Sequence, residues 1–322
     1  MKKGRVLSGM QPTGPLHVGN YLGTLQNFLA IQSQYECYFA IVDYHSITEN
    51  YQPKEKYNQI LSLAMDYLAA GIDPKKCVIF LQSDVPEHTE LAWVFNTITP
   101  MSELERMTQF KDKASRQAKN INAGLFTYPV LQAADILLYK AKAVPVGLDQ
   151  EQHLELARKI ARWFNNKFGQ TFPEPETLFT DTPKVMSLQD PNKKMSKSLG
   201  ENHCIFLDDE PKVIEQKIKK AVTDTGDGQG SGAKNLLLLF EKFGDKKTAK
   251  KYNGQKSIRY ADLKTDLAKA IITYFSDFRK TKSILLAKPK QVEKILAAGA
   301  KKSQKIARTT MREVRQKIGI RK

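Results

Sequence analysis

Short apolar runs alternate with helical patterns through the first third of the chain. Short runs with the composition of buried strands occupy residues 6–8, 37–42 and 78–81, and the continuous apolar run at 37–42 is typical of a strand covered on both faces. Two amphipathic helical patterns lie between them, over residues 18–31 and 53–70. Strand, helix, strand, helix and strand in this order predict a parallel, doubly wound sheet, which is an α/β fold of the Rossmann-like kind.

A mostly helical insertion near residues 86–139 separates this part from its continuation. A basic segment over residues 106–119 interrupts the helical patterns of the insertion. After it, residues 143–147 have the composition of another short strand, and residues 150–168 follow a helical pattern. Residues 1–205 are therefore predicted to form one α/β domain.

The pattern changes beyond residue 207. Strand patterns end there, and lysine-rich amphipathic helices are predicted near residues 210–222, 233–243, 258–278 and 290–318. The glycine-rich residues 226–232 are predicted to be a flexible linker and not a phosphate loop, because they lack a GK[ST] sequence and no strand precedes them. Residues 206–322 are thus predicted to form an all-helical domain, whose last helix packs back on the α/β domain.

The net charge of +17 is concentrated near the carboxyl end of the chain. Residues 281–322 hold thirteen Lys and Arg against Glu293 and Glu313, which gives this segment +11 of the total. Charge alone favours a simple solvated surface. The sharper alternative is a surface that binds the phosphates of a nucleic acid.

Three cysteines and the amino-terminal sequence suggest a reducing compartment. Cys37, Cys77 and Cys204 are far apart and odd in number, which argues against a disulfide framework or a CxxC metal site. The first residues lack the apolar segment of a signal peptide, and no segment has the length and apolarity of a membrane span. We therefore expect a cytoplasmic protein.

Two distant segments carry the chemistry. Residues 12–20 form a Gly/Pro loop that leads into HVGN, and residues 194–198 read KMSKS. Glycines at positions 14 and 19 allow a nucleotide to approach the backbone closely, and a helix start near residues 17–20 is expected to present free N–H groups to phosphate. Imidazole and amide groups can donate to phosphate oxygens, and the two lysines can neutralise departing pyrophosphate.

Each of these signals is weak alone, because a histidine at a helix start usually caps it and a KxxK pair usually lies on the surface. Together, and with further matches along nearly the whole chain, they resemble the bacterial-type tryptophanyl-tRNA synthetases, which are class I aminoacyl-tRNA synthetases. HVGN stands where many class I enzymes have HIGH, and this family often has the Asn. The matching segments are residues 8–14, 16–21, 41–48, 103–111, 133–137, 144–147, 149–150 and 194–198.

The resemblance implies an ATP site built from both segments, in which positioning and charge neutralisation carry adenylation. The implied catalytic residues are His17, Asn20, Lys113, Lys194 and Lys197. The implied ATP-binding residues are Gln11, Pro12, Thr13, Gly19, Asn20, Gly147, Asp149, Gln150, Met195, Ser196 and Lys197. Mg²⁺ is expected to arrive with ATP and to be held mainly by the phosphates, with no metal site of the protein's own.

An amino-acid pocket is predicted on the helix that contains Asp135. Tyr128, Gln132, Asp135 and Tyr139 lie on one face of that helix, and the neighbours of Asp135 are apolar. A buried carboxylate needs donors, which a lysine or a helix start could supply. With the resemblance, we expect Asp135 to accept the indole N–H of tryptophan, since an indole N–H can only donate.

The resemblance also supplies the remaining residues of the pocket. The implied tryptophan-binding residues are Leu7, Gln11, His45, Tyr128, Gln132, Asp135 and Gln150. Gln132, Leu7 and Leu148 depart from residues frequent in bacterial members, which affects the expected pocket shape more than the reaction. Gln132 is open to two interpretations, a contact with Asp135 or a contact with the substrate.

The implied activity is adenylation of L-tryptophan with Mg-ATP, followed by transfer to the 3′-terminal ribose of its tRNA. Residues 1–205 become the catalytic domain and residues 206–322 an anticodon-binding domain, in an enzyme that is a homodimer in this family. The alternatives are a tyrosine-specific relative, a small nucleotidyltransferase and a non-catalytic RNA-binding paralogue. The setting of Asp135 argues against the first, the basic helices against the second, and the intact His17, Asn20, Lys194 and Lys197 against the third.

Overall fold

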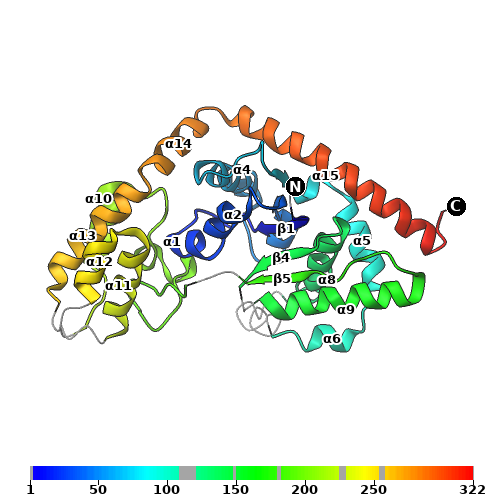
Figure 1. The fold of residues 1–322 in the computed structure, drawn as a ribbon, viewed down its shortest axis with the longest axis horizontal. Coiled ribbons are helices and arrows are strands. Elements are labelled where there is room, and N and C mark those ends of the chain that lie inside the picture. The colour runs from blue at the N-terminus through cyan, green and yellow to red at the C-terminus, as the bar shows by residue number, and fades with distance from the viewer. Residues whose placement is uncertain are drawn as a thin grey trace.

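A computed structural model of the chain describes residues 3–108, 121–147, 150–179, 183–224, 230–253 and 258–321. Within these ranges, one parallel sheet has the strand order β3-β2-β1-β4-β5, with helices on both of its faces (Figure 1). The strands are β1 (Arg5–Met10), β2 (Glu36–Ile41), β3 (Val78–Leu81), β4 (Ala143–Val146) and β5 (Glu176–Phe179). The predicted α/β doubly wound fold is therefore confirmed.

The edge strand β5 was not predicted from the sequence. It pairs in parallel with β4 only, and its first two residues, Glu176 and Thr177, are polar. An edge strand with one neighbour needs no continuous apolar run, so its sequence lacks the pattern that identifies buried strands.

The helix predicted over residues 18–31 is divided into three parts. Its segments are α1 (Val18–Asn20), a π-helical turn (Tyr21–Leu25) and α2 (Gln26–Ile31). A π turn inserts extra residues without changing which face is buried, so Leu22, Leu25 and Phe28 still reach the core. The apolar spacing therefore found the buried face but not the change in winding.

The other helices of the first part of the chain cover the sheet and form the insertion. They are α3 (Asp43–Ser46), α4 (Pro53–Ala69), α5 (Glu87–Asn96), α6 (Met101–Glu105), α8 (Ala123–Leu138) and α9 (Glu151–Phe168). Pro53 occupies the first turn of α4, where its missing N–H has no partner to lose. Among the described residues, none of the helices is long and apolar enough to cross a membrane.

The regular elements among the described residues of the carboxyl-terminal part are all helices. Its helices are α10 (Pro211–Lys219), α11 (Ser231–Phe243), α12 (Lys246–Asn253), α13 (Tyr260–Tyr274), α14 (Ser276–Leu286) and α15 (Pro289–Lys317). The prediction of a single helix over residues 258–278 is wrong, because the helix is interrupted at Phe275, between α13 and α14. The helix α12 escaped prediction because only Ala249 and Tyr252 are buried in its lysine-rich sequence.

The predicted linker at residues 226–232 is partly wrong. Ser231 and Gly232 begin α11, and Gly232 lies so close to Val222 that a Cβ would meet its carbonyl oxygen at 2.3 Å. Residues 225–229 lie outside the described residues.

Apolar packing continues across the predicted boundary near residue 205. One core cluster joins Phe28 and Phe39 of the α/β part to Ile214, Leu239 and other residues of the following helices. The aromatic rings of Tyr21 and Phe275 lie 5.0 Å apart at the same seam. The two parts therefore pack together, and their division into a catalytic and an anticodon-binding domain stays a prediction.

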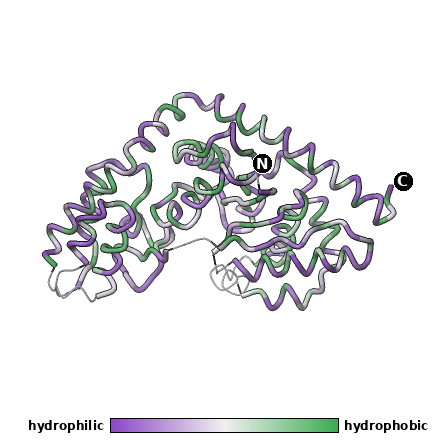
Figure 2. Tube along the Cα trace, in the orientation of Figure 1, coloured by the Kyte–Doolittle hydropathy of each residue, from purple (hydrophilic) through white to green (hydrophobic). Residues whose placement is uncertain are grey.

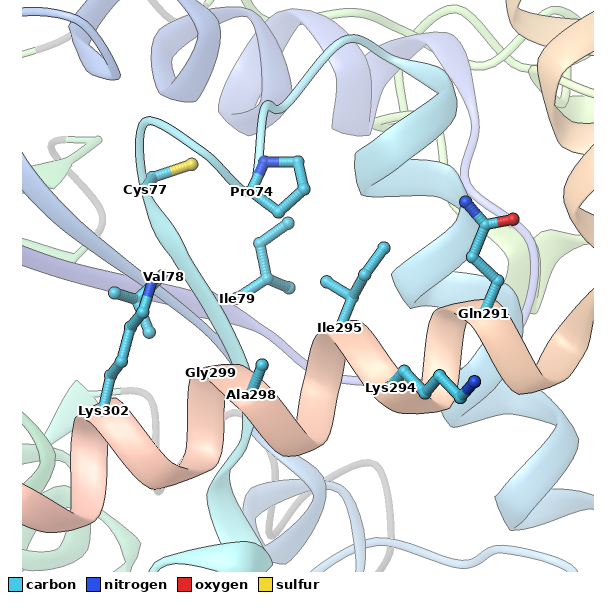
Figure 3. Close-up of a pocket in the computed structure, with 10 residues that line it drawn as sticks. All are labelled: Pro74, Cys77, Val78, Ile79, Gln291, Lys294, Ile295, Ala298, Gly299 and Lys302. Atoms are coloured by element: carbon cyan, nitrogen blue, oxygen red, sulfur yellow. The ribbon is translucent and has the colours of Figure 1, made fainter.

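The terminal helix α15 runs along the outside of the α/β part and packs on β3, α4 and α5 (Figure 1). Hydrophilic and hydrophobic residues alternate along it, as expected of a helix with one buried face (Figure 2). At its seam with β3 lies a pocket of about 260 Å³, lined by Cys77, Val78, Ile295 and Lys302 among others (Figure 3). Gly299 faces β3 there, where an added Cβ would meet the carbonyl oxygen of Ile79 at 1.8 Å.

Replacement of Gly299 by alanine is expected to lower the free energy of unfolding by about 1–3 kcal/mol, because the helix must move away from β3 to admit the methyl group. Urea denaturation of Gly299→Ala beside Gly23→Ala tests this, since a Cβ at Gly23 meets nothing within 4 Å. A Gly299→Ala protein as stable as the Gly23→Ala protein would contradict the close approach of α15.

Candidate active site

The candidate site begins at the carboxyl end of β1. Gly9 passes close to β2, since a Cβ there would meet the carbonyl oxygen of Ala40 at 2.7 Å. Gln11 to Thr13 then make a tight turn, in which the Thr13 N–H donates to the Gln11 carbonyl at 3.0 Å. Gly14 has φ +109°, a backbone conformation that favours glycine. The loop thus turns sharply away from the sheet edge at which ligands of such folds bind.

His17 and Asn20 form a reciprocal cap at the start of α1. The His17 Nδ1 accepts from the Asn20 N–H at 3.3 Å, and the Asn20 Oδ1 accepts from the His17 N–H at 3.1 Å. The Val18 N–H donates to the Ile205 carbonyl at 2.9 Å. The prediction of free N–H groups is therefore wrong for His17, Val18 and Asn20, because protein acceptors already use them.

The His17 imidazole is held neutral. Its side chain is 7% exposed, and burial, followed by the charges of Lys197 and Lys194, lowers its pKa to about 4. Because Nδ1 accepts a hydrogen bond, the proton of the neutral ring must be on Nε2. His17 therefore offers Nε2–H as a donor, and Gly19 leaves room for the ring, since a Cβ on it would lie 3.0 Å from the imidazole.

The lowered pKa of His17 predicts a loss of stability in mild acid. Protonation opposes folding when the folded pKa, about 4, lies below the ordinary 6.5. The contribution of neutral His17 to the free energy of unfolding is complete above pH 6.5 and decreases as the pH falls toward 4. At pH 5 it has decreased by about 2 kcal/mol. His17→Asn, which keeps a capping side chain but cannot titrate, should show a smaller loss of unfolding free energy between pH 7 and pH 5. Parallel losses in the two proteins would contradict a neutral His17, since all other groups are shared.

The lysine loop lies against the same region. Met195 is buried, its N–H donates to the Val185 carbonyl at 3.0 Å, and Lys194 bridges to Met186 as a short antiparallel pair. With Met195 fixed in the core, the loop holds Lys194 exposed and Lys197 half-buried. The Ser196 and Ser198 hydroxyls are hydrogen-bonded to each other at 2.9 Å.

Lys197 joins the two distant segments directly. Its Nζ donates to the Thr13 carbonyl at 3.1 Å and lies 3.2 Å from the Thr13 hydroxyl, although 184 residues separate them. Burial lowers the pKa of Lys197, which shows that the ammonium is partly removed from water. The structure therefore brings the HVGN loop and the KMSKS loop into one site.

A second buried polar cluster surrounds Asp135 on α8. Its Oδ1 accepts from Gln82 at 2.8 Å and from His88 Nδ1 at 2.6 Å. Its Oδ2 accepts from His45 Nε2 and from Gln82, both at 2.9 Å. Burial alone would raise the pKa of Asp135, but His88 and His45 overcome it and lower the pKa to about 2. Asp135 is thus an ionised carboxylate with donors on both oxygens.

The cluster extends away from the sheet edge. His88 Nε2 lies 2.9 Å from the hydroxyl of Tyr139, and both side chains are completely buried. Burial, and then the charge of Asp135, raises the pKa of Tyr139 well above its usual range. Two histidines and a glutamine therefore supply the donors to Asp135, and neither a lysine nor a helix start does so among the described residues.

Sequence reasoning missed Gln82 and His88. Gln82 follows β3 immediately, so it lies at the same sheet edge as the ends of β1 and β2, and a polar residue at a strand end was the available signal. Gln82, and not Gln132, makes the side-chain amide contact with Asp135. The other interpretation of Gln132, a contact with the substrate, stays a prediction.

The other predicted site residues lie around these clusters. Leu7 is buried in β1, Tyr128 is buried with its hydroxyl 2.9 Å from His153 Nε2, and its ring lies edge-on to His45. Gln11, Gln132, Gly147 and Gln150 are half-buried, and the Gln150 N–H donates to the Gly147 carbonyl at 3.0 Å. Lys113 and Asp149 lie outside the described residues.

Lys56 was also missed by sequence reasoning. Its Nζ donates to the Pro12 carbonyl at 3.1 Å and to the Ser46 hydroxyl at 3.0 Å, so α4 holds the turn after β1 against α3. In the sequence it is one of several charged residues in the first turns of a helix, and nothing distinguishes it.

Comparison with known proteins gives a consistent result. The family model described as tRNA synthetases class I (W and Y) matches residues 1–314. Tryptophan–tRNA ligase 2 of Streptomyces avermitilis is 43% identical over 329 residues, which cover 98% of this chain and 97% of that protein. Tryptophan–tRNA ligase of Rickettsia conorii is 44% identical over 329 residues, with 99% of each chain covered.

A solved structure agrees with these relatives. The tryptophanyl-tRNA synthetase of Campylobacter jejuni, crystallised with ADP and tryptophan, superposes with a TM-score of 0.86 at 37% identity. The match covers 98% of this chain and 99% of that one. The family-model match and the identity to the relatives extend over nearly the whole length, and the chain therefore belongs to the class I tRNA synthetases of the tryptophan and tyrosine group.

Proposed function

We propose that the chain is a tryptophan–tRNA ligase, which converts L-tryptophan and Mg-ATP to tryptophanyl-adenylate and pyrophosphate and then charges tRNA(Trp). The relatives named as tryptophan–tRNA ligases support this assignment over nearly their full length. The observation that carries the mechanism is the contact between Lys197 and Thr13, because it closes the two halves of an ATP site on each other.

In the proposed reaction the tryptophan carboxylate attacks the α-phosphate of ATP, and the bond from that phosphorus to the bridging oxygen of pyrophosphate breaks. The carboxylate is already ionised, so the step requires no general base. His17 Nε2–H and the Asn20 side chain donate to phosphate oxygens, while Lys194 and Lys197 neutralise the charge that develops on pyrophosphate. Lys113 and Ser196 complete the phosphate-binding side of the site, and Met195 is proposed to contribute to the ATP site beside them.

Gln11, Pro12 and Gly19 are proposed to line the nucleotide, with Gly147, Asp149 and Gln150 at the ribose and amino-acid side. Mg²⁺ would be held by the triphosphate, where it draws charge from the phosphates. The charges that act on His17 at the loops are the ammonium groups of Lys197 and Lys194, and they suit a phosphate-held ion better than one bound to carboxylates. Thr13 holds Lys197 until ATP phosphates offer a stronger acceptor.

The amino-acid pocket is proposed to lie on the exposed side of the Asp135 cluster. Asp135 accepts the indole N–H, Leu7 and His45 line the ring, and Gln132 contacts the substrate. Tyr128 and Gln150 bind the α-ammonium group. The ionised state of Asp135 supports this assignment, because a carboxylate with a pKa of about 2 can only accept a hydrogen bond at physiological pH.

The carboxyl-terminal helices α10–α14 are proposed to bind the anticodon arm of tRNA, in a cytoplasmic homodimer. Two large apolar side chains favour self-association, because Trp93 on α5 is 72% exposed and Met101 on α6 is 66% exposed. A shallow pocket of about 460 Å³, lined by Ile98, Pro100, Trp163 and others, lies in the same region of the chain.

Amino-acid-dependent exchange of pyrophosphate into ATP, measured with all twenty amino acids, tests the proposed function. Exchange with tryptophan is expected. Exchange with tyrosine in its place would make the chain a tyrosine-specific relative, and exchange with no amino acid would leave a non-catalytic RNA-binding protein or a different nucleotidyltransferase. Charging of tRNA(Trp) with labelled tryptophan tests the second step.

A further inference from the structure

One face of α15 carries a row of basic side chains, which only Ala297 and Ala298 interrupt near its middle. Successive residues of a helix are 100° apart, and this spacing places the members of the row within about 60° of one another. The row runs for about 33 Å at 1.5 Å per residue. We call this row the basic stripe, and its members are Lys290, Lys294, Lys301, Lys305, Arg308 and Arg312, all of them exposed.

The opposite face of α15 is fixed to the protein. Val292, Leu296, Ala307, Met311 and Val314 are buried along it, as are other small residues between them. The helix therefore presents the basic stripe outward in a fixed orientation along its whole length, and a flexible tail would not.

Acidic partners are nearly absent from the basic stripe. Glu313 is bound by Lys140 and Lys317, and Glu293 accepts from the Tyr57 hydroxyl, so both acids of α15 are engaged elsewhere. Within the described part of the chain, only Arg308 of the stripe forms an ion pair, a 3.4 Å contact with Glu87. The other basic residues near the end of the helix, Arg315 and Lys317, are held in ion pairs.

The composition of α15 indicates which part of a nucleic acid would bind. The helix contains no aromatic residue that could stack on an unpaired base. Lysine and arginine side chains spread along a rod suit phosphate oxygens, which position a nucleic acid without reading its sequence. The helical surface of base-paired RNA, recognised through its backbone and shape, fits such a row.

We propose that the basic stripe binds the sugar–phosphate backbone of a base-paired stem of the tRNA, on the outside of the α/β part. The proposal rests on the proposed function, since it assumes that tRNA is the second substrate. The tRNA would thereby have a contact surface besides α10–α14, because α15 runs from the middle of the molecule to the end that is opposite α10–α13 (Figure 1). Six of the thirteen Lys and Arg of residues 281–322 would thereby act on the stem and not on the anticodon.

The chain offers a closely matched control for this proposal. Lys302 is adjacent to Lys301 and is also exposed, but it points about 100° away, toward the pocket at the β3 seam, which Lys294 of the stripe also lines (Figure 3). Lys301→Gln and Lys302→Gln remove the same charge from the same turn, and Lys and Gln have similar helix propensities. The two variants therefore differ only in the face that loses its charge.

The test compares tRNA(Trp) binding by the wild type, Lys301→Gln, the double variant Lys301→Gln/Lys305→Gln, and Lys302→Gln at several salt concentrations. Each phosphate contact contributes about 0.7–0.9 to the slope of log K against log salt. The double variant is expected to reduce the slope by about 1.4–1.8 and to weaken binding more than about tenfold near 0.1 M salt. Lys301→Gln should show half of the change in slope, and Lys302→Gln should match the wild type.

Three results would overturn the proposal. If the double variant has an unchanged slope, the stripe is only a solvated surface. If Lys302→Gln changes the slope as much as Lys301→Gln does, the cause is the net charge of the protein and not the stripe. Loss of binding to vesicles of phosphatidylserine, with tRNA binding retained, would assign the stripe to an anionic membrane.

Tryptophan-dependent pyrophosphate exchange needs no tRNA, so it should be the same in all variants. Its absence from the wild type would contradict the proposed function and not the stripe.

Discussion

Lys197→Ala is expected to slow adenylation of tryptophan by about 10²- to 10³-fold, because it removes a positioned cation from the departing pyrophosphate. In the free protein the Lys197 ammonium is half-buried and bound to Thr13, so it is already directed at the loop that follows β1. Little rearrangement is then needed when phosphates arrive. Rapid-quench measurement of adenylate formation, with saturating ATP and tryptophan, reports this step directly.

Lys193→Ala provides the comparison for that experiment. Lys193 lies in the same loop, its side chain is 63% exposed, and it pairs with Asp190 at 3.0 Å. Its removal takes one positive charge from the same loop but leaves the Lys197–Thr13 contact intact. A similar loss of rate in both variants would mean that the loop acts through its general charge, and the assignment of Lys197 would then be wrong.

The sequence predicted the sheet better than the helices around it. Strands buried on both faces are continuous apolar runs, so β1 to β4 were visible, whereas the polar edge strand β5 was not. Helical spacing identified the buried face of residues 18–31, but the π turn after Asn20 leaves the same apolar positions inside. Local patterns report which residues are buried, and they are much less informative about how the backbone winds between them.

The parts of the candidate site that consist of adjacent residues could be predicted from the sequence, whereas the parts assembled from distant residues could not. Each of the HVGN and KMSKS motifs is an unbroken segment of the sequence and can be recognised there. The parallel sheet topology requires that the end of β1 lie at the ligand edge. The donors to Asp135 come from three separate places, His45 after β2, Gln82 after β3 and His88 on α5. A histidine on a helix has many ordinary uses, so only the three-dimensional structure could select His88.

The largest expected effect on specificity comes from Asp135→Asn. The new amide has one oxygen where the carboxylate has two, and its NH₂ group would face histidine or glutamine donors. We expect the kcat/KM for tryptophan to fall by about 10⁴-fold, which is the discrimination available to a site built around one substrate hydrogen bond. The loss should be smaller for phenylalanine, which has no N–H to bind, so discrimination between the two amino acids should decrease. Pyrophosphate exchange with each amino acid measures both quantities.

Because Asp135 is already bound by protein donors, a second variant, Tyr139→Phe, is informative. Both carboxylate oxygens already have donors, so the indole N–H must share or replace one of them. His45 is the most accessible candidate at 5% exposed, while Gln82 and His88 are completely buried. Tyr139→Phe leaves these three donors in place and removes only the hydroxyl beside His88. Like Asp135→Asn it should weaken tryptophan binding, but by about tenfold or less. Folded Asp135→Asn protein with an unchanged preference for tryptophan would show that the carboxylate is a structural group of the core, and that the indole is recognised elsewhere.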